Sequence, residues 1–197
     1  MNRYLFMIDR ISAWSGKLFA WSVVLLTLLV CFDVTMRYIL NKPNQSVFDL
    51  AYILYGLLFM MAGAYTLSRN GHVRADMMYR SFQPRTQAWF DLVLYIVFFI
   101  PGISALVYAG IEFTQISWAM KEVSSVTSSG VPVYPYKLVI PVAGGLLLLQ
   151  GVAEIIRCVQ CIRTGEWPQR LHDVEEEDIE QIKELLTGEG AEEGAKS

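Results

Sequence analysis

The sequence contains few charged residues, and those it has are unevenly spread. Charged side chains make up 18% of the 197 residues, whereas 54% are hydrophobic. Four stretches carry no charge over 15, 18, 20 and 16 residues, namely Leu18–Phe32, Leu50–Leu67, Leu92–Ile111 and Leu138–Ala153. Because soluble domains average about 25% charged residues, this composition argues against a soluble protein.

The four apolar stretches predict membrane-spanning helices. A helix needs about 20 mostly apolar residues to cross the hydrocarbon core, and each stretch reaches that length when flanking polar residues are included. Buried helices of a soluble protein are the alternative, but no amphipathic face is available to cover four of them. The stretches do not alternate, which argues against a transmembrane barrel. We predict an all-α integral membrane protein with spans at residues 16–38, 47–68, 89–118 and 136–157, plus short interfacial amphipathic helices.

The distribution of Lys and Arg predicts that both termini are cytoplasmic. Basic residues in short loops near helix ends are enriched on the inner side. An inner N-terminus places ten of them inside, against four outside (Arg37, Lys42, Lys121 and Lys137). The inner set is Arg3, Arg10, Lys17, Arg69, Arg74, Arg80, Arg85, Arg157, Arg163 and Arg170. The first stretch is followed by no cleavage pattern of small residues, so we expect an uncleaved helix there.

Three segments flank or interrupt the membrane domain of residues 16–163. Residues 1–15 form an N-terminal juxtamembrane segment that we expect to lie along the inner surface as a helix. In the middle segment, apolar residues recur at helical spacing from Ala75 to Phe82, which predicts a second surface helix ending near Pro84. Residues 164–197 form an acidic cytoplasmic tail, in which we expect a short amphipathic helix followed by disorder.

The ends of the spans carry recognisable local signals. Ser46 is a potential N-cap of the second helix, and Asp49 at its third position favours the positive helix end. The loop "KEVSSVTSSGVPVYPY" after the third helix is rich in Ser and Pro, so we expect it to be extended and exposed.

Proline and glycine mark two further features of the spans. Pro101 predicts a kink in the third helix. Gly144 and Gly151, seven residues apart on the fourth helix, share one face and permit another helix to approach closely.

The sequence lacks the residues that most chemistry would require. His72 and His172 both lie outside the apolar stretches, so no intramembrane histidine is available as a haem ligand. No Gly-rich phosphate loop, serine elbow or metal-binding spacing occurs. Three cysteines do not make a disulfide framework, and "CVQC" at Cys158 and Cys161 has no second pair, so we interpret these two as small apolar residues.

Polar residues near the ends of the spans are the remaining candidates for function. Such residues are costly at membrane depth and are often functional or buried against a partner. They are Asp33 and Arg37, Glu112 and Gln115, and Gln150 and Glu154. None lies at the centre of a span, where an ion pathway would need ionisable groups, and each could simply snorkel to the interface. The chain therefore has the character of an accessory subunit, with a redox-enzyme anchor or a self-contained small transporter as alternatives.

The sequence also resembles a known family. The stretch "RYILNKPNQSVFDLAYILYGLLFMMAGAYTLSRNGHVRADMMY" is similar to the first half of the small membrane (Q) subunit of tripartite ATP-independent periplasmic (TRAP) transporters. The second half is similar in layout, with Pro132, Tyr136 and Pro141 approaching the fourth helix. The positions that match the family pattern are Arg37, Tyr38, Asn41, Ser46, Asp49, Ala62, Gly63, His72, Arg74 and Asp76. Asp49 stands where the family commonly has Glu.

The resemblance, which covers about Trp14–Arg163, implies a static subunit of a three-part importer. Its expected partners are a large membrane (M) subunit, which carries an organic anion with sodium, a periplasmic substrate-binding (P) protein, and the lipid bilayer, but no nucleic acid. It implies a bacterial inner-membrane location, no enzymatic activity and no cofactor, with sodium bound by the large subunit. We expect no substrate, metal or catalytic site in this chain. The candidates for partner contact or structural roles are Asp33, Arg37, Asn41, Asp49, His72, Arg74, Asp76, Gly144 and Gly151.

Overall fold

The computed structural model describes residues 2–69, 82–128 and 130–168, and every regular element in these ranges is helical. Two long helices come first, α1 (Asn2–Tyr38) and α2 (Gln45–Ser68). A continuous helical run follows, made of α4 (Pro84–Leu94), the π-helical turn η1 (Tyr95–Phe99) and α5 (Ile100–Met120). The short α6 (Tyr134–Lys137) and the long α7 (Val139–Thr164) complete the described chain.

Four helical runs are long and apolar enough to cross a membrane, which confirms the predicted all-α membrane class. The first run shows one difference from the expectation. Residues 2–15 of the proposed surface segment and the first span belong to a single helix, α1, without an interruption between them. At about 1.5 Å per residue α1 is about 55 Å long, so it extends well beyond a hydrocarbon core of about 30 Å.

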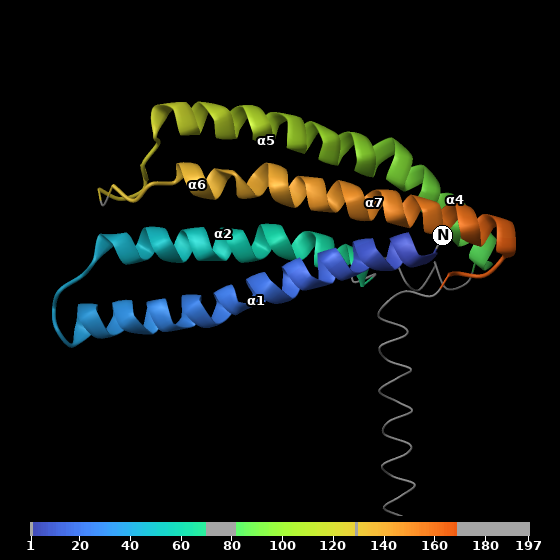
Figure 1. Ribbon diagram of the computed structural model, residues 1–197. Coiled ribbons are helices and arrows are strands. Elements are labelled where there is room, and N and C mark those ends of the chain that lie inside the picture. The colour runs from blue at the N-terminus through green and yellow to red at the C-terminus, as the bar shows by residue number, and fades with distance from the viewer. Residues whose placement is uncertain (1, 70–81, 129, 169–197) are drawn as a thin grey trace, which may run out of the picture.

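The long helices lie side by side in the order α1, α2, α7, α5 (Figure 1). Helix α2 packs between α1 and α7, and α7 packs between α2 and α5. The N-terminal part of α1 also reaches α7 at the end of the molecule where α4 and the C-terminal end of α7 lie. The arrangement is therefore an open layer rather than a closed four-helix bundle.

The open layer leaves the flanking helices exposed. One third (33%) of the apolar window of α7 is buried, compared with 6% for α1 and 0% for the run containing α5. The small core at the α4 end consists of Ala88, Cys158 and Cys161. Both cysteines are buried, as expected of small apolar residues in a helix contact.

Two prolines alter the helical hydrogen bonding. Pro101 has no N–H for the carbonyl of Val97, and the turn just before it is π-helical, with the Ile100 N–H bonded to the Tyr95 carbonyl. The predicted kink at Pro101 thus takes the form of a widened turn, and the run follows a curved path (Figure 1). Pro141 similarly deprives the Lys137 carbonyl of its helical donor, and the Thr114 hydroxyl of α5 lies 3.0 Å from that oxygen.

Candidate functional site

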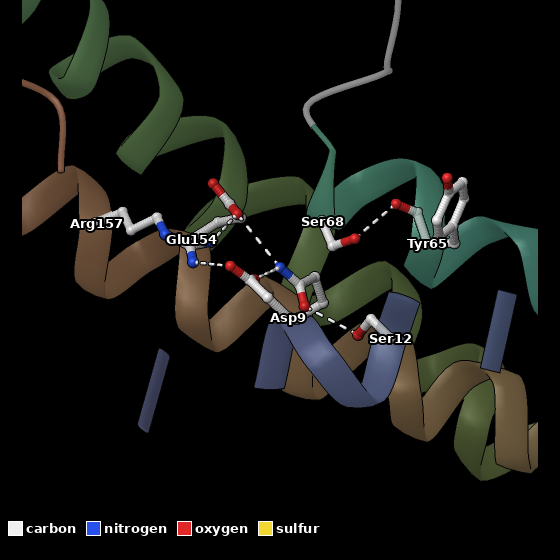
Figure 2. A network of polar contacts seen from close by, with 7 residues as sticks. Asp9, Ser12, Tyr65, Ser68, Glu154 and Arg157 are labelled. Atoms are coloured by element: carbon white, nitrogen blue, oxygen red, sulfur yellow. Dashed lines mark hydrogen bonds and ion pairs between the residues drawn. The ribbon is translucent and has the colours of Figure 1, made fainter. Parts of the chain in front are cut away.

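A buried polar cluster joins the first and last long helices. We call it the Asp9 cluster; its members are Asp9 and Ser12 of α1 and Gln150, Glu154 and Arg157 of α7 (Figure 2). Each of these residues is at most 1% exposed. On α7 the three residues occupy positions i, i+4 and i+7, so helical periodicity places them on one face. On α1, Asp9 and Ser12 share a face in the same way.

Hydrogen bonds connect all the members of the Asp9 cluster. The amide of Gln150 donates to Asp9 at 2.9 Å and accepts from the Ser12 hydroxyl at 2.9 Å. The two terminal nitrogens of Arg157 each contact a different carboxylate, Glu154 and Asp9, at 2.5 Å. Buried charges are tolerated when they are paired and hydrogen-bonded in this way. The arrangement binds α1 to α7 rather than presenting a reactive group to solvent.

A second polar cluster lies at the opposite end of the layer. We call it the Asp49 cluster; it consists of Asp49 of α2 with Ser124 and Thr127 of the loop after α5. Asp49 is 3% exposed, accepts from the Ser124 hydroxyl at 2.7 Å, and accepts a very short bond from Thr127. Asp49, one of the candidate acids, thus fastens a loop to the start of α2.

Much of the loop is exposed, as expected, but it is not a simple extended segment. It folds back on itself through the Ser124 N–H, bonded to the Val131 carbonyl at 2.8 Å, and the Val133 N–H, bonded to the Glu122 carbonyl at 3.0 Å. The Ser128 hydroxyl also lies 2.6 Å from the side-chain oxygen of Gln45 at the first turn of α2. The loop is held against α2 because its Ser and Thr hydroxyl groups donate hydrogen bonds to side chains of α2.

The predicted N-cap of α2 is wrong by two residues. Asn44, not Ser46, caps the helix, because the Asn44 side-chain oxygen accepts from the Ser46 N–H at 3.1 Å. Helix α2 begins at Gln45, so Asp49 is the fifth helical residue and lies beyond the first turn. Its partners are the loop hydroxyls, and the helix dipole is not its main interaction.

Asp33 and Arg37 form an ion pair with each other near the C-terminal end of α1. The N–O distance is 2.9 Å, and their side chains are 21% and 49% exposed. One Asp33 oxygen is buried without a hydrogen-bond partner among the described residues. Asn41 follows α1 with a φ of 54°, a left-handed conformation that Asn adopts more readily than most residues.

Gly144 and Gly151 lie at the contact of α7 with the neighbouring helical run. A Cβ atom on Gly144 would come within 2.6 Å of Val107, and one on Gly151 would come within 2.4 Å of Phe99. Both glycines therefore allow the close approach of α5 and η1 to α7. Gly145, on another face, has open space beside it.

The remaining predicted site residues cannot be compared with the structure. His72, Arg74 and Asp76, together with the proposed surface helix from Ala75 to Phe82, fall mostly or wholly outside the described residues. Glu112 and Gln115 are exposed on α5, whereas Gln150 and Glu154 are buried rather than snorkelling.

Sequence reasoning missed the central role of Asp9 and Arg157. The sequence places Asp9 in a surface segment and gives Arg157 no role beyond that of an inner positive charge. A signal was present, because Gln150, Glu154 and Arg157 form a polar stripe on an otherwise apolar helix. The partner of that stripe lies 148 residues from Arg157, and no local pattern identifies it.

Four long apolar helices, fastened to one another by buried polar clusters at both ends of a layer, define a multi-pass α-helical membrane protein. A family model described as "Tripartite ATP-independent periplasmic transporters, DctQ component" matches residues 26–161, and the chain belongs to this family. It is thus the small membrane component of a TRAP transporter, from a family of transport components rather than enzymes. No curated protein matches the chain.

Proposed function

We propose that this chain is the static scaffold subunit of a TRAP-type importer in the bacterial inner membrane, with both termini cytoplasmic. A large membrane subunit packs beside it and moves an organic anion, a carboxylate or a sulfonate, together with sodium. A soluble periplasmic protein delivers the anion. The observation that carries the proposal is the open single layer of helices.

An open layer favours a scaffold over a self-contained transporter. A transport path must be enclosed by protein, because exposed polar backbone and side chains are costly in lipid. In this layer α1 and α5 lie at opposite edges, and almost no residue of their apolar windows is buried within the chain. The exposed apolar side chains on α5 include Leu106, Ile111 and Phe113. We assign these exposed surfaces to lipid and to the large subunit.

The polar contacts support a static role for the chain. The Asp9 cluster joins α1 to α7, and the Asp49 cluster joins the loop after α5 to α2. The carboxylates of both clusters are engaged with partners inside the chain, so we assign substrate and sodium binding to the large subunit. Substrate selection then depends on the large subunit and the soluble binding protein.

Copurification from native membranes tests the partnership. Mass spectrometry of proteins that copurify with the tagged chain should identify a large multi-pass subunit. The Asp33–Arg37 pair is the exposed polar group that we expect to meet it near the membrane face. Arg37→Ala should therefore reduce the amount of large subunit recovered, whereas Lys42→Ala in the neighbouring exposed turn should leave it unchanged. Recovery of the large subunit at equal levels with both variants contradicts this contact.

Uptake by proteoliposomes tests the functional part of the proposal. The large subunit with this chain and the binding protein should accumulate an organic anion when an inward sodium gradient is imposed. Omission of this chain should abolish or strongly reduce uptake. Transport by this chain alone would instead establish the self-contained transporter, and a redox absorbance spectrum of the purified chain would favour the enzyme anchor.

A further inference from the structure

The N-terminal part of α1 has two chemically different faces. One face is buried against the rest of the protein and contains Leu5, Asp9 and Ser12. The opposite face carries three exposed cations at intervals of seven residues, with exposed Met7 and Trp14 between them. We call this face the basic strip; its residues are Arg3, Met7, Arg10, Trp14 and Lys17.

No described residue neutralises the positive charge of the basic strip. Asp9 is the sole carboxylate among the first 32 residues, and it is buried on the other face in contact with Arg157. Within residues 2–69, 82–128 and 130–168, none of Arg3, Arg10 and Lys17 forms a hydrogen bond or an ion pair. The described part of the chain therefore leaves three cations on one helix face without a counter-charge.

The strip begins where the apolar part of α1 ends. Lys17 directly precedes the uncharged stretch Leu18–Phe32, so it marks the boundary of the hydrocarbon core. Seven residues correspond to about two turns and about 10.5 Å of helix, which carries Arg10 into the headgroup layer and Arg3 to its outer edge. Trp14, 66% exposed between Lys17 and Arg10, is a side chain that prefers this interface.

We propose that the basic strip binds an anionic phospholipid. Lys and Arg neutralise the phosphates of the headgroup, while Trp14, next to the hydrocarbon boundary, contacts the glycerol and upper acyl chains. The surface along these residues is hollowed, which accommodates a headgroup between the cations. An acidic protein segment would satisfy the cations, but it would not account for the exposed Trp14 beside the hydrocarbon boundary. A lipid supplies phosphate oxygens for the cations and an apolar contact for Trp14.

Lipid binding by the full chain, purified in mild detergent, tests the proposal. Native mass spectrometry would follow titration with phosphatidylglycerol and, in parallel, with phosphatidylcholine. The test variant is Arg3→Gln/Arg10→Gln/Lys17→Gln. The control Lys42→Gln/Lys121→Gln/Arg163→Gln removes the same charge from exposed positions elsewhere. Each basic residue near an anionic surface contributes about fivefold in affinity, so the test variant should lose about a hundredfold for phosphatidylglycerol.

The expected pattern has three parts. The control variant should bind phosphatidylglycerol as the unmodified chain does, phosphatidylcholine should bind equally weakly to all three, and excess inorganic phosphate should not displace the bound lipid. Equal phosphatidylglycerol affinity of test and control variants would overturn the proposal, as would displacement by phosphate. Unchanged lipid binding, combined with loss of a copurifying protein from the test variant, would show a protein occupant and would also overturn it.

A single substitution tests the same proposal if the triple variant misfolds. Arg10→Gln alone should weaken phosphatidylglycerol binding about fivefold while helix content and thermal midpoint stay unchanged. Unaltered affinity in a folded Arg10→Gln protein counts against the proposal.

Discussion

Asp9 and Arg157 form a fully buried ion pair across 148 residues of sequence, with an N–O distance of 2.5 Å. Glu154 holds the other terminal nitrogen of the same guanidinium, and Gln150 holds the other oxygen of Asp9. One arginine thus joins a neighbour on its own helix to a residue near the start of the chain.

Removal of Arg157 should destabilise the protein strongly. Arg157→Ala leaves two buried carboxylates without their shared cation, and breaking a buried pair costs about 3–5 kcal/mol. Arg163→Ala, at an exposed position one and a half turns further along α7, should cost less than about 1 kcal/mol. The measurement is the free energy of unfolding in detergent. Similar values for the two variants would show that the Asp9 cluster contributes little to stability.

Substitution of Asp49 should release the loop after α5. Asp49→Ala deprives the Ser124 and Thr127 hydroxyls of a shared acceptor, at a cost of about 1–3 kcal/mol. Amide hydrogen exchange of residues 121–128 should then become faster, while exchange in α7 should not change. Glu112→Ala, which removes an exposed acid from α5, serves as the control. Slow exchange retained in Asp49→Ala would mean that the bonds within the loop hold it without α2.

The glycines of α7 should respond differently to an added methyl group. Gly144→Ala forces Val107 to move, because the new Cβ would lie 2.6 Å from it, and overpacking of this kind costs about 1–3 kcal/mol. Gly145→Ala meets nothing within 4 Å and should be neutral or stabilising by up to about 1 kcal/mol. Thermal unfolding of both variants checks the difference. Equal midpoints would contradict a close contact between α5 and α7.

The contact between Glu122 and Lys137 should make stability depend on acid pH. The hydrogen bond from Lys137 lowers the pKa of Glu122 below its usual value of 4.5. Because the folded-state pKa is the lower one, the contribution is complete above pH 4.5 and is lost as the pH falls through the folded value. The effect is small and salt-sensitive, since Glu122 is exposed. The stability difference between the unmodified chain and Glu122→Gln should shrink on acidification, and a constant difference argues against the pair.

The proposed orientation has a direct test. A reporter fused after Ser197 should be active only in its cytoplasmic form, and one inserted at Ser128 only in its periplasmic form. Periplasmic activity at Ser197 or cytoplasmic activity at Ser128 would reverse or break the four-span topology.

The features that could be predicted from the sequence are those set by local composition. Uninterrupted apolar stretches indicate membrane helices wherever they pack, so the fold class was evident. The effect of Pro101 was also evident, because a missing N–H acts on the turn that contains it. The close contacts of Gly144 and Gly151 follow from their spacing and small size.

Features that depend on distant partners could not be predicted in the same way. The contact of Asp9 with Arg157 depends on how α1 crosses α7, and the order of helices in the layer has no signature in hydropathy. Asp49 was singled out, but its partners Ser124 and Thr127 lie 75 and 78 residues away in a loop whose composition suggested full exposure. Asn44 and Ser46 are both suitable N-cap residues and lie two positions apart, so the sequence alone does not decide which of them caps α2.

The pairing of α1 with α7 also sets the order in which the protein folds during its synthesis. When α1 enters the membrane, the cations of its basic strip lie on the face opposite Asp9, and Arg157, which pairs with Asp9, is among the last of the described residues to be made. The N-terminal end of the chain therefore reaches its final environment only after synthesis of α7 is nearly complete. A chain cut short before α7 would keep three of its four spans but would lack the guanidinium that pairs with Asp9.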